Sequence, residues 1–338
     1  MTTSTLTSST TPGYPMRLST DAFPEAMRLS AWREIYGRNV AQFDIEPLDD
    51  LPFHADVTFH QLDGIGFAIG SRSDANYLMT SALAARARDN VIFGAVLAGT
   101  GFISQFGREA TIEAGGAVLL SGNDPSAFAL RNRGRGLTLS LPRDSFMPMI
   151  ANPNGAFAKT IPAGTMALRY LLEYLAILQA EREPVPIDLR RTIARHVTDL
   201  AVLAVGATRE VTEIASQGAL RAARVLAIRR EVDRRFADPD FSLPVLARQF
   251  GITPRYIQSL LAENDTSFID EVMQRRLQRA HEMLSSPLYR GMTIIDLASD
   301  CGFASVSNFY RMFRRTFGAT PSNVRAVAAD IPSDDARD

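Results

Sequence analysis

The sequence predicts an α+β protein of two domains: an antiparallel β-barrel or jelly roll with flanking helices, followed by an all-α domain. Short β-rich runs separated by turn residues fill 55–142, and many short strands at close spacing favour a barrel or sandwich. From residue 166 onward the apolar residues recur at spacings of three and four, which is typical of amphipathic helices. A length of 338 residues with 46% hydrophobic content suits two domains.

The two ends of the chain are polar. Residues 1–20 are rich in Ser, Thr and Pro, and such segments bury too little apolar surface to offset their ordering entropy. We therefore expect a disordered arm over 1–20 and an acidic flexible tail over 328–338. The start lacks a basic flank and an apolar run, and the chain has one cysteine, so we expect a cytoplasmic location. The longest apolar runs, such as 91–99, are shorter than the roughly 20 residues that cross a bilayer, and no membrane partner is expected.

The segment 21–165 is expected to form the barrel domain. It opens with a helical segment over 23–38, in which Met27, Trp32, Ile35 and Tyr36 are the apolar positions. Gly115 and Gly116 can adopt the positive φ of a tight turn between strands. The expected strands are 55–62, 64–71, 90–99, 101–106, 109–114, 116–121, 126–132 and 136–142.

The segment 166–214 is expected to contain two amphipathic helices, at 166–181 and 187–207, before a linker near 211–219. The first carries a leucine stripe that either packs on the barrel or forms the seam of a homodimer. Both alternatives are open at this stage. The stripe is Leu168, Leu171, Leu172, Leu175 and Leu178, and the apolar side of the second helix is Leu189, Ile193, Leu200 and Ala204.

An internal repeat lies within 215–327. Leu246 and Gly251 are matched by Leu297 and Gly302 at an offset of 51 residues, which becomes 52 after the turn. Each copy predicts a helix-turn-helix: Ser242 or Thr293 caps a short helix, a glycine ends it, and Thr253 or Ser305 caps the next. The apolar residue after the glycine, Ile252 or Phe303, would fill the corner between the helices.

The second helix of each copy divides into an apolar and a polar side. Ile257, Leu260 and Leu261 in the first copy, and Phe309, Met312, Phe313 and Phe317 in the second, are expected in the core. Short polar side chains and arginine on the other side suit base edges in a major groove. The candidate DNA-binding residues are Arg255, Tyr256, Gln258, Ser259, Val306, Ser307, Asn308, Tyr310 and Arg311.

A long helix over 267–287 is expected to join the two copies, with Ser267 as its cap. Residues 219–327 hold 16 basic and 11 acidic side chains, a positive excess typical of a phosphate-facing domain. On the joining helix, Arg275 and Arg276 either contact phosphate or pair with Glu271, and both interpretations are open.

The motifs SLPVLARQFGIT, RRLQRAHEML and IIDLASDCGFASVSNFYRMFRRTFGATPSNVR resemble the AraC/XylS family of bacterial transcription regulators over 219–327. The resemblance implies a seven-helix domain with two helix-turn-helix units, sequence-specific binding to a double-stranded DNA operator, and RNA polymerase as a partner. The family's base-contacting positions fall on the candidate residues above. The chain differs from the common pattern at Leu261, where the family usually has Phe, and at Ser259, where Arg is frequent.

The segment before this domain resembles, less specifically, the cupin-like sensing domains of such regulators, through DIEPLDDLPFHADVTF and GREATIEAGGAVLLSGNDP. That resemblance implies a small-molecule effector in the barrel, whose pocket residues the sequence does not identify, and dimerisation through the helical pair. The function predicted is therefore a DNA-binding transcription regulator controlled by an effector, an activator rather than a repressor.

Other chemistry has weak support in the sequence. The histidines His54, His60, His196 and His281 lack metal-ligand spacing, and no nucleophile elbow or glycine-rich phosphate loop is present. We therefore expect no metal, no cofactor and no enzymatic activity, and we expect Cys301 in the core rather than in a redox role. The alternatives are a cupin-type enzyme or metal sensor fused to a DNA-binding module, and a regulator that needs no effector.

Overall fold

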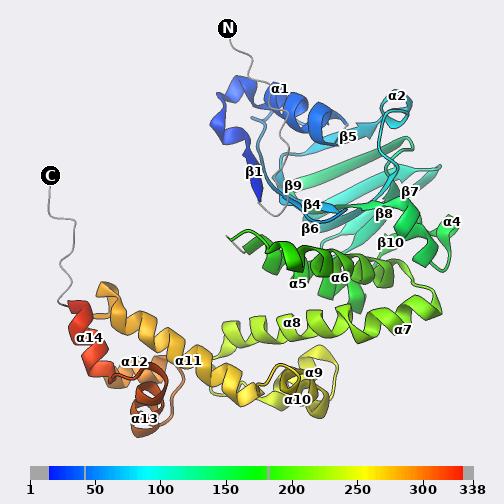
Figure 1. Cartoon of the computed structure of the whole chain (residues 1–338). Helices are drawn as coiled ribbons and strands as arrows, with labels where there is room; N and C mark the ends of the chain where they lie inside the picture. The colour runs from blue at the N-terminus through cyan, green and yellow to red at the C-terminus, as the bar shows by residue number, and fades with distance from the viewer. Residues whose placement is uncertain (1–14, 42, 181–182, 330–338) are drawn as a thin grey trace. The chain divides into compact units, whose positions relative to one another are not determined.

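The computed structural model describes residues 15–41, 43–180 and 183–329. The chain divides into two compact units, 1–223 and 224–338 (Figure 1). Among the described residues, every strand belongs to the first unit and the second is helical, which confirms the predicted α+β class. The finer domain bounds expected from the sequence stay predictions.

The described part of the first unit contains ten strands in one antiparallel sheet. The main path through the sheet is β1-β3-β4-β9-β6-β8-β10, while β5 pairs with both β2 and β9, and β7 pairs with β6. The strands are β1 Met16–Ser19, β2 Asp44–Pro47, β3 Ala55–Gln61, β4 Gly66–Arg72, β5 Ala75–Met79, β6 Asn90–Gln105, β7 Arg108–Glu113, β8 Ala117–Ser121, β9 Ser126–Pro142 and β10 Thr160–Ile161.

Strands β6 and β9 are the longest and pair with each other along almost their whole length. The sequence predicted each of them as two strands, and that prediction is wrong. Gly99 adopts a φ of +81° inside β6, and shifts in the pairing register between Val96 and Thr100 absorb the irregularity, as β-bulges do. Strand β5 was not expected, because Asp74 and Asn76 resemble turn residues.

The expected disordered arm over 1–20 is too long. Strand β1 pairs with β3, the Arg17 guanidinium donates two hydrogen bonds to Asp56, and Thr20 is buried. Pairing with β3 gives hydrogen-bond partners to the backbone and side chains of residues 16–20. A polar segment without such partners would stay unfolded, which is why the prediction missed this strand. At the other end, α14 (Pro321–Ala329) includes the first two residues of the expected tail. Residues 1–14 and 330–338 lie outside the described residues.

Helices flank the sheet of the first unit. The predicted helical segment over 23–38 is present as three short pieces, and α7 occupies the region where a linker was expected, with Thr208 accepting a capping hydrogen bond from the Val211 N–H. The linker predicted near 211–219 is therefore wrong, because most of it is helical. The elements are η1 Thr20–Ala22, η2 Glu25–Met27, α1 Arg28–Trp32, η3 Arg33–Ala41, α2 Ser81–Ala84, α3 Arg143–Phe146, η4 Met147–Met149, α4 Pro153–Ala156, α5 Met166–Ala180, α6 Ile187–Val205 and α7 Arg209–Gln217.

The paired helices α5 and α6 bury much of their apolar surface inside the first unit. Leu168, Leu171 and Leu175 are fully buried, and α5 packs mainly against α6. The Tyr174 hydroxyl lies 3.1 Å from Nδ1 of His196 across this contact. Leu189, predicted on the apolar side of the second helix, is instead 48% exposed, because it lies in the first turn of α6.

The second unit is built from short helices around one long one. The predicted pair of helix-turn-helix units is present as α9–α10 and α12–α13, and the long helix between them is α11 (Figure 1). The elements are α8 Ala219–Arg235, α9 Leu243–Phe250, α10 Pro254–Ala262, α11 Phe268–Ser285, η5 Pro287–Tyr289, α12 Ile294–Asp300, α13 Val306–Phe317 and α14.

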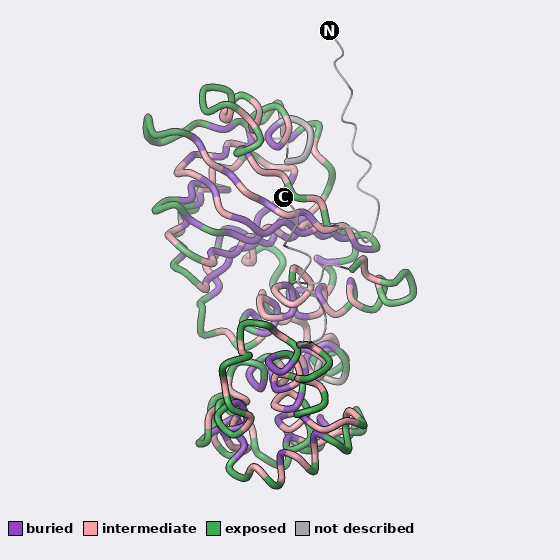
Figure 2. Tube along the Cα trace, turned by 90° about the vertical axis from the view of Figure 1, so that its left-hand side faces the viewer, coloured by how far each residue is buried: buried purple, intermediate pink, exposed green. Residues whose placement is uncertain are grey.

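Two hydrophobic cores hold the second unit together. Ile257, Leu260 and Leu261 lie in the first core, and Phe309 and Phe313 lie in the second, all fully buried as expected. Met312 and Phe317 pack at the edge of the second core. In Figure 2 the strands of the first unit carry long buried stretches, whereas the helices alternate between buried and exposed residues.

The expected helix caps are present with one exception. Thr253, Ser267, Thr293 and Ser305 each accept a hydrogen bond from a backbone N–H in the first turn of the helix that follows. Ser242 precedes α9 but forms no capping hydrogen bond. After α9, Gly251 adopts a left-handed φ of +65°, the geometry that favours glycine at a helix end.

Gly302 meets a tighter constraint than Gly251. Its φ is +84°, and a Cβ at this position would lie 2.9 Å from Nε of Arg276 and 3.1 Å from the Cα of Ala237. A Cβ at Gly251 would meet open space. The turn of the second helix-turn-helix is therefore packed directly against α11 and the segment after α8.

We predict that Gly302→Ala lowers the free energy of unfolding of the second unit by about 2–3 kcal/mol, since it adds steric overlap to the cost of a left-handed alanine. The control Gly251→Ala should cost only about 1 kcal/mol, because it introduces the backbone strain alone. Urea unfolding followed by far-UV circular dichroism measures both. Equal losses for the two variants would contradict the packing described for Gly302.

Cys301 lies in the second core, fully buried, with its Sγ 3.8 Å from Sδ of Met283. This placement confirms the core position expected from the sequence. Burial raises the pKa of the thiol to about 11, and the thiolate is the reactive form of cysteine.

We predict that the folded chain resists labelling by a thiol reagent at pH 8, because Cys301 is both protonated and inaccessible there. Labelling should become fast in denaturing urea. Since the chain has one cysteine, the rate reports this position alone. Fast labelling of the folded chain would show that the second core opens readily.

Candidate nucleic-acid interface

Each helix-turn-helix presents its second helix at the surface. The corner residue Phe303 is buried and Ile252 is half-buried, so each turn is anchored by the apolar side chain that follows its glycine. Because three apolar residues of α10 and two of α13 are fully buried, the opposite sides of these helices face outward.

Helix α10 presents Arg255, Gln258 and Ser259, all exposed. The fourth candidate, Tyr256, differs from them. It is half-buried, and its hydroxyl oxygen accepts a hydrogen bond of 2.9 Å from Nη1 of Arg224. The Arg224 guanidinium also lies 5.2 Å from the centroid of its ring. Tyr256 therefore ties α10 to α8, and three side chains make up the free polar side of α10.

Helix α13 presents Ser307 and Arg311 as exposed side chains, with Val306, Asn308 and Tyr310 half-buried. Arg311 donates a hydrogen bond of 2.9 Å from Nη2 to Oδ1 of Asn308, so these two residues lie side by side on the helix surface. The Tyr310 ring contacts Phe309 edge-on at 5.8 Å. All five candidates of the second copy thus reach the surface at least in part.

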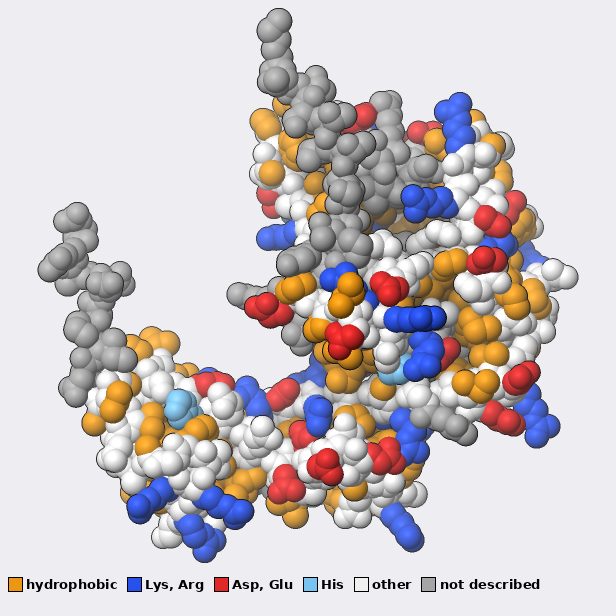
Figure 3. Space-filling model, in the orientation of Figure 1, with side chains coloured by type: hydrophobic (Ala, Val, Ile, Leu, Met, Phe, Trp, Pro, Cys, Tyr) orange, Lys and Arg blue, Asp and Glu red, His pale blue; other side chains and the backbone are white. Residues whose placement is uncertain are grey.

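Two further arginines belong to this surface. Arg314 and Arg315 are exposed in the last turn of α13, and the candidate residues named from the sequence do not include them. No acidic residue occurs in Val306–Phe317, which is the sequence signal that could have included them. In Figure 3, Lys and Arg side chains gather over the end of the second unit where Figure 1 labels α13.

These arginines differ from several other arginines of the second unit, which have carboxylate partners. Arg229 pairs with Glu271 at 3.1 Å, Arg235 with Asp238 at 2.7 Å, and Arg275 with Asp233 at 2.9 Å. Within the described ranges, no carboxylate pairs with Arg311, Arg314 or Arg315. Among the described residues, no carboxylate therefore neutralises the positive charge of α13.

The two open interpretations of Arg275 and Arg276 are resolved against pairing with Glu271. Glu271 pairs with Arg229 instead. Arg275 pairs with Asp233 and Glu282, and Arg276 donates a hydrogen bond of 2.6 Å from Nε to the Phe236 carbonyl oxygen. Arg275 and Arg276 of α11 thus both bind the end of α8 and the residue that follows it.

The histidines do not form a common site. His281 lies against Phe313 and Phe317 at the edge of the second core, and His60 stacks on Phe67 with ring centroids 4.4 Å apart. Burial lowers the pKa of His60 to about 4. In 15–41, 43–180 and 183–329, no group of three or more His, Cys, Asp or Glu side chains could hold a metal ion. No described helix is long and apolar enough to cross a membrane.

The first unit contains a large cavity inside the sheet, with a volume of about 1390 Å³. Its lining comes mainly from β1, β3, β4, β5, β6, β8, β9 and the segment around Tyr36. The inward sides of β4, β6 and β9 carry small residues, and this keeps the interior open. These residues are Gly66, Ala68, Gly94, Gly136, Thr138 and Ser140.

Comparison with known proteins agrees with this arrangement. A family model described as a helix-turn-helix domain matches residues 246–326, and one described as an AraC-binding-like domain matches residues 32–205. The AraC-like transcriptional activator CuxR has a solved structure with a TM-score of 0.50 and 16% identity, covering 85% of this chain and 99% of that one. This likeness supports the two-domain fold.

Two relatives share sequence with the chain. It is 33% identical over 106 residues to the transcriptional activator RhrA of Rhizobium meliloti (strain 1021), a match that spans 31% of this chain and only 33% of RhrA. It is 25% identical over 234 residues to the transcriptional activator NphR of Rhodococcus sp, spanning 68% of each protein. Because the AraC-binding-like match alone extends over more than half of the residues, the chain belongs to the AraC family of DNA-binding transcription regulators.

Proposed function

We propose that the chain is a sequence-specific transcriptional activator that binds a double-stranded DNA operator with α10 and α13 and responds to a small-molecule effector in the first unit. The observation that carries the proposal is the surface of α13, where three exposed arginines with no carboxylate partner among the described residues adjoin short polar side chains. Unneutralised arginine beside small polar groups suits a helix in the major groove.

The proposed division of labour follows from exposure. Arg255, Gln258 and Ser259 on α10, and Ser307, Asn308 and Arg311 on α13, would read base edges, with Val306 in apolar contact. The half-buried Tyr256 and Tyr310 would contact DNA with the exposed part of their side chains, while their buried parts pack α10 and α13 into the domain. Arg314 and Arg315 would contact phosphate, so binding would weaken as salt concentration rises.

Activation is supported by the names of the relatives, since both RhrA and NphR are described as transcriptional activators. Because an activator acts on RNA polymerase, we propose RNA polymerase as the protein partner. We also propose a cytoplasmic location, where the chain would meet its operator. The effector would occupy the cavity of the first unit. Protein interiors are normally packed with few voids, and a cavity of this size is typical of a ligand-binding site.

We also propose that the chain forms a homodimer through the first unit. The leucine stripe of α5 is mostly used inside the unit, which favours the packing alternative for Leu168, Leu171 and Leu175. The start of α6 is different, because Ile187 is 77% exposed and Leu189 48%. An exposed apolar pair supports a contact with a second copy at this position.

For DNA binding we predict that Arg311→Ala weakens binding to the operator by about 1–3 kcal/mol and relaxes preference at one base pair. Arg314→Ala should weaken binding to cognate and scrambled DNA alike and reduce the slope of affinity against salt by about one. Fluorescence anisotropy with both DNAs at several salt concentrations measures these effects.

The matched control is Arg234→Ala, which removes an exposed arginine of α8 that is paired with Glu231 and lies outside the proposed interface. It should leave both affinities unchanged. If Arg311→Ala lowered affinity for cognate and scrambled DNA equally, Arg311 would be a phosphate contact, and base readout by α13 would lose its main support.

For assembly we predict that the purified chain sediments as a dimer and that the double variant Ile187→Glu, Leu189→Glu sediments as a monomer, because charge would be forced into an apolar contact. The control is Ile269→Glu, Leu288→Glu, which alters two exposed apolar residues of the second unit and should leave the dimer intact. A monomeric native chain, or a dimer that survives the first substitution, would contradict the proposed seam.

A further inference from the structure

One arginine of the first unit is buried without a carboxylate partner. Arg72 ends β4 and is only 5% exposed, and it lines the cavity. Among the described residues its side chain forms a single hydrogen bond, from Nη1 to the Tyr36 hydroxyl at 3.4 Å, and its Nε forms none. Burying a guanidinium is costly unless its charge and its N–H groups are matched.

Aromatic rings surround the guanidinium. Its carbon lies 5.4 Å from the ring centroid of Tyr36 and 5.3 Å from that of Tyr77, so cation–π attraction offsets part of the cost of burial. The Tyr36 and Tyr77 hydroxyl oxygens both lie beside the guanidinium, but among the described residues only the Tyr36 oxygen accepts a hydrogen bond of good geometry from it. Burial disfavours the charged form of Arg72, but the two tyrosine oxygens beside it raise its pKa, and the side chain keeps its charge.

Other polar groups at this end of the barrel also lack hydrogen bonds. Within the described chain the Tyr77 hydroxyl and Nε1 of Trp32 are buried and form no hydrogen bond of good geometry, although the Tyr77 hydroxyl lies close enough to Arg72 and Trp32 to interact with both. Buried polar atoms without partners are rare in folded proteins, and a group of them invites a missing ligand atom. Tyr77, like Arg72, lines the cavity.

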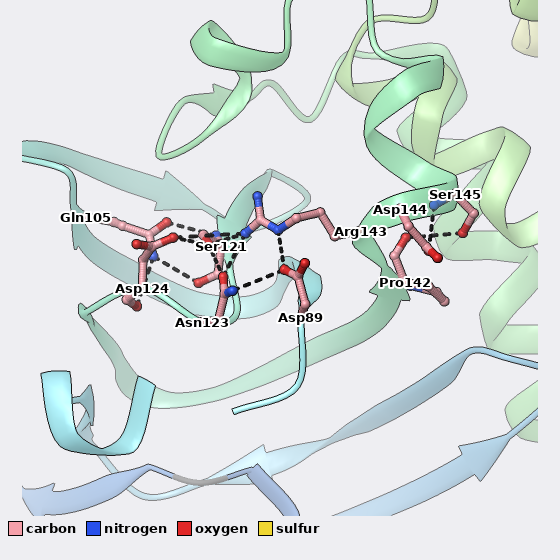
Figure 4. Close-up of polar contacts among 9 residues, drawn as sticks. All are labelled: Asp89, Gln105, Ser121, Asn123, Asp124, Pro142, Arg143, Asp144 and Ser145. Carbon is pink, nitrogen blue, oxygen red and sulfur yellow. Dashed lines mark hydrogen bonds and ion pairs between the residues drawn. The ribbon is translucent and has the colours of Figure 1, made fainter. Parts of the chain in front are cut away.

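Arg143 shows what a satisfied arginine looks like in the same unit (Figure 4). Its guanidinium donates to Asp89 at 2.6 Å, to Asn123 at 3.0 Å and to the Ser121 hydroxyl. Asn123 also donates to Asp89, and Gln105 closes the network by bonding the backbone of Ser121. The unit can therefore surround an arginine with oxygen acceptors, and at Arg72 it does not.

The rest of the cavity wall is largely apolar, although its lining also includes Arg88 and two charged residues that have ion-pair partners, Arg17 with Asp56 and Asp21 with Arg28. Phe59, Phe67, Phe128, Leu130 and Leu137 line it together with the small residues of the inward face. The sheet register explains the placement, since Ala68 on β4 and Gly94 on β6 both pair with Thr138 on β9. A ligand that fits this space needs an apolar body and one anionic group at the Arg72 end.

A second polar group, the ring of His60, lies elsewhere in the same cavity. His60 lines it, and its Nε2 is buried without a hydrogen-bond partner among the described residues. Because the pKa of His60 is about 4, the ring is neutral near pH 7 and can exchange one hydrogen bond with an uncharged group. This contact adds no charge to the site.

We propose that the cavity binds a small organic carboxylate with an apolar body, its carboxylate accepting hydrogen bonds from Arg72 and from the Tyr77 hydroxyl. Charge-assisted hydrogen bonds of this kind are among the strong ones in proteins. The inference rests on the proposed effector-binding function and narrows it to one chemical class. It also explains why a charge is kept at a place where an apolar side chain would be more stable.

The test uses the full-length chain without DNA and four probes: phenylacetate, octanoate and the matching amides, phenylacetamide and octanamide. Calorimetric titration and thermal unfolding should show binding of at least one carboxylate and none or far weaker binding of its amide, because the amide lacks the charge. The aromatic and aliphatic arms distinguish the two shapes of ligand.

Arg72→Met should weaken binding of that carboxylate by about 10- to 100-fold. It should leave the midpoint of thermal unfolding of the unliganded chain unchanged or raise it, since an unmatched buried charge is removed. Tyr77→Phe should weaken binding by about fivefold and provides a milder test if the first variant folds poorly. The control is Arg131→Met, which removes an exposed arginine stacked on Phe102 outside the cavity, and it should change neither quantity.

Three results would overturn the inference: no binding of either carboxylate, equal binding of acid and amide, or full binding by Arg72→Met. Failure here is distinct from failure of the proposed regulator. Operator binding by α10 and α13 is measured on DNA, so a chain that binds DNA but no carboxylate would lose the ligand class alone. A chain that binds carboxylate but no operator would lose the proposed regulatory function and keep the cavity site.

Discussion

The second unit depends on α11, because the two halves of this one helix are buried in two different hydrophobic cores. Phe268 and Val272 belong to the core of the first helix-turn-helix, while Leu277, Ala280 and Leu284 belong to that of the second. Because α11 is shared by both cores, it fixes the position of α10 relative to α13. The hydrogen bond from Arg276 to the Phe236 carbonyl oxygen, packed under Gly302, anchors the middle of that helix to the end of α8.

Packing also sorts the arginines of the second unit by role. Several of those on α8 and α11 form ion pairs, and two of these pairs join the two helices, Arg229 with Glu271 and Arg275 with Asp233. Such pairs hold the helices in register and leave little net charge for a ligand. On α13, Arg311 bonds to Asn308 and pairs with no carboxylate in the part of the chain that the structure describes. The same residue type thus joins helices in one place and stays at the surface in another, where the proposed DNA contact would use it.

The sheet of the first unit follows a comparable rule. The long pairing of β6 with β9 provides a continuous wall, and the small residues on its inward side leave a cavity instead of a filled core. Strand periodicity could predict the sheet, but it could not predict that β6 and β9 are each continuous. Gly99 resembles a turn in sequence, and only the partner strand decides that it forms a bulge. The same limit hid β1, whose polar residues are ordered by pairing with β3.

The sequence by itself determined the two-domain class, the repeated helix-turn-helix, most of the caps and the core position of Cys301, because each depends on local periodicity or short-range hydrogen bonds. The candidate DNA-binding residues followed from the same periodicity, and all of them reach the surface at least in part. Only the tertiary structure decided which side chains are free to act. Tyr256 is bonded to Arg224, Arg276 to Phe236, and Arg72 is buried without a carboxylate. Those outcomes depend on partners distant in the chain, which no local pattern encodes.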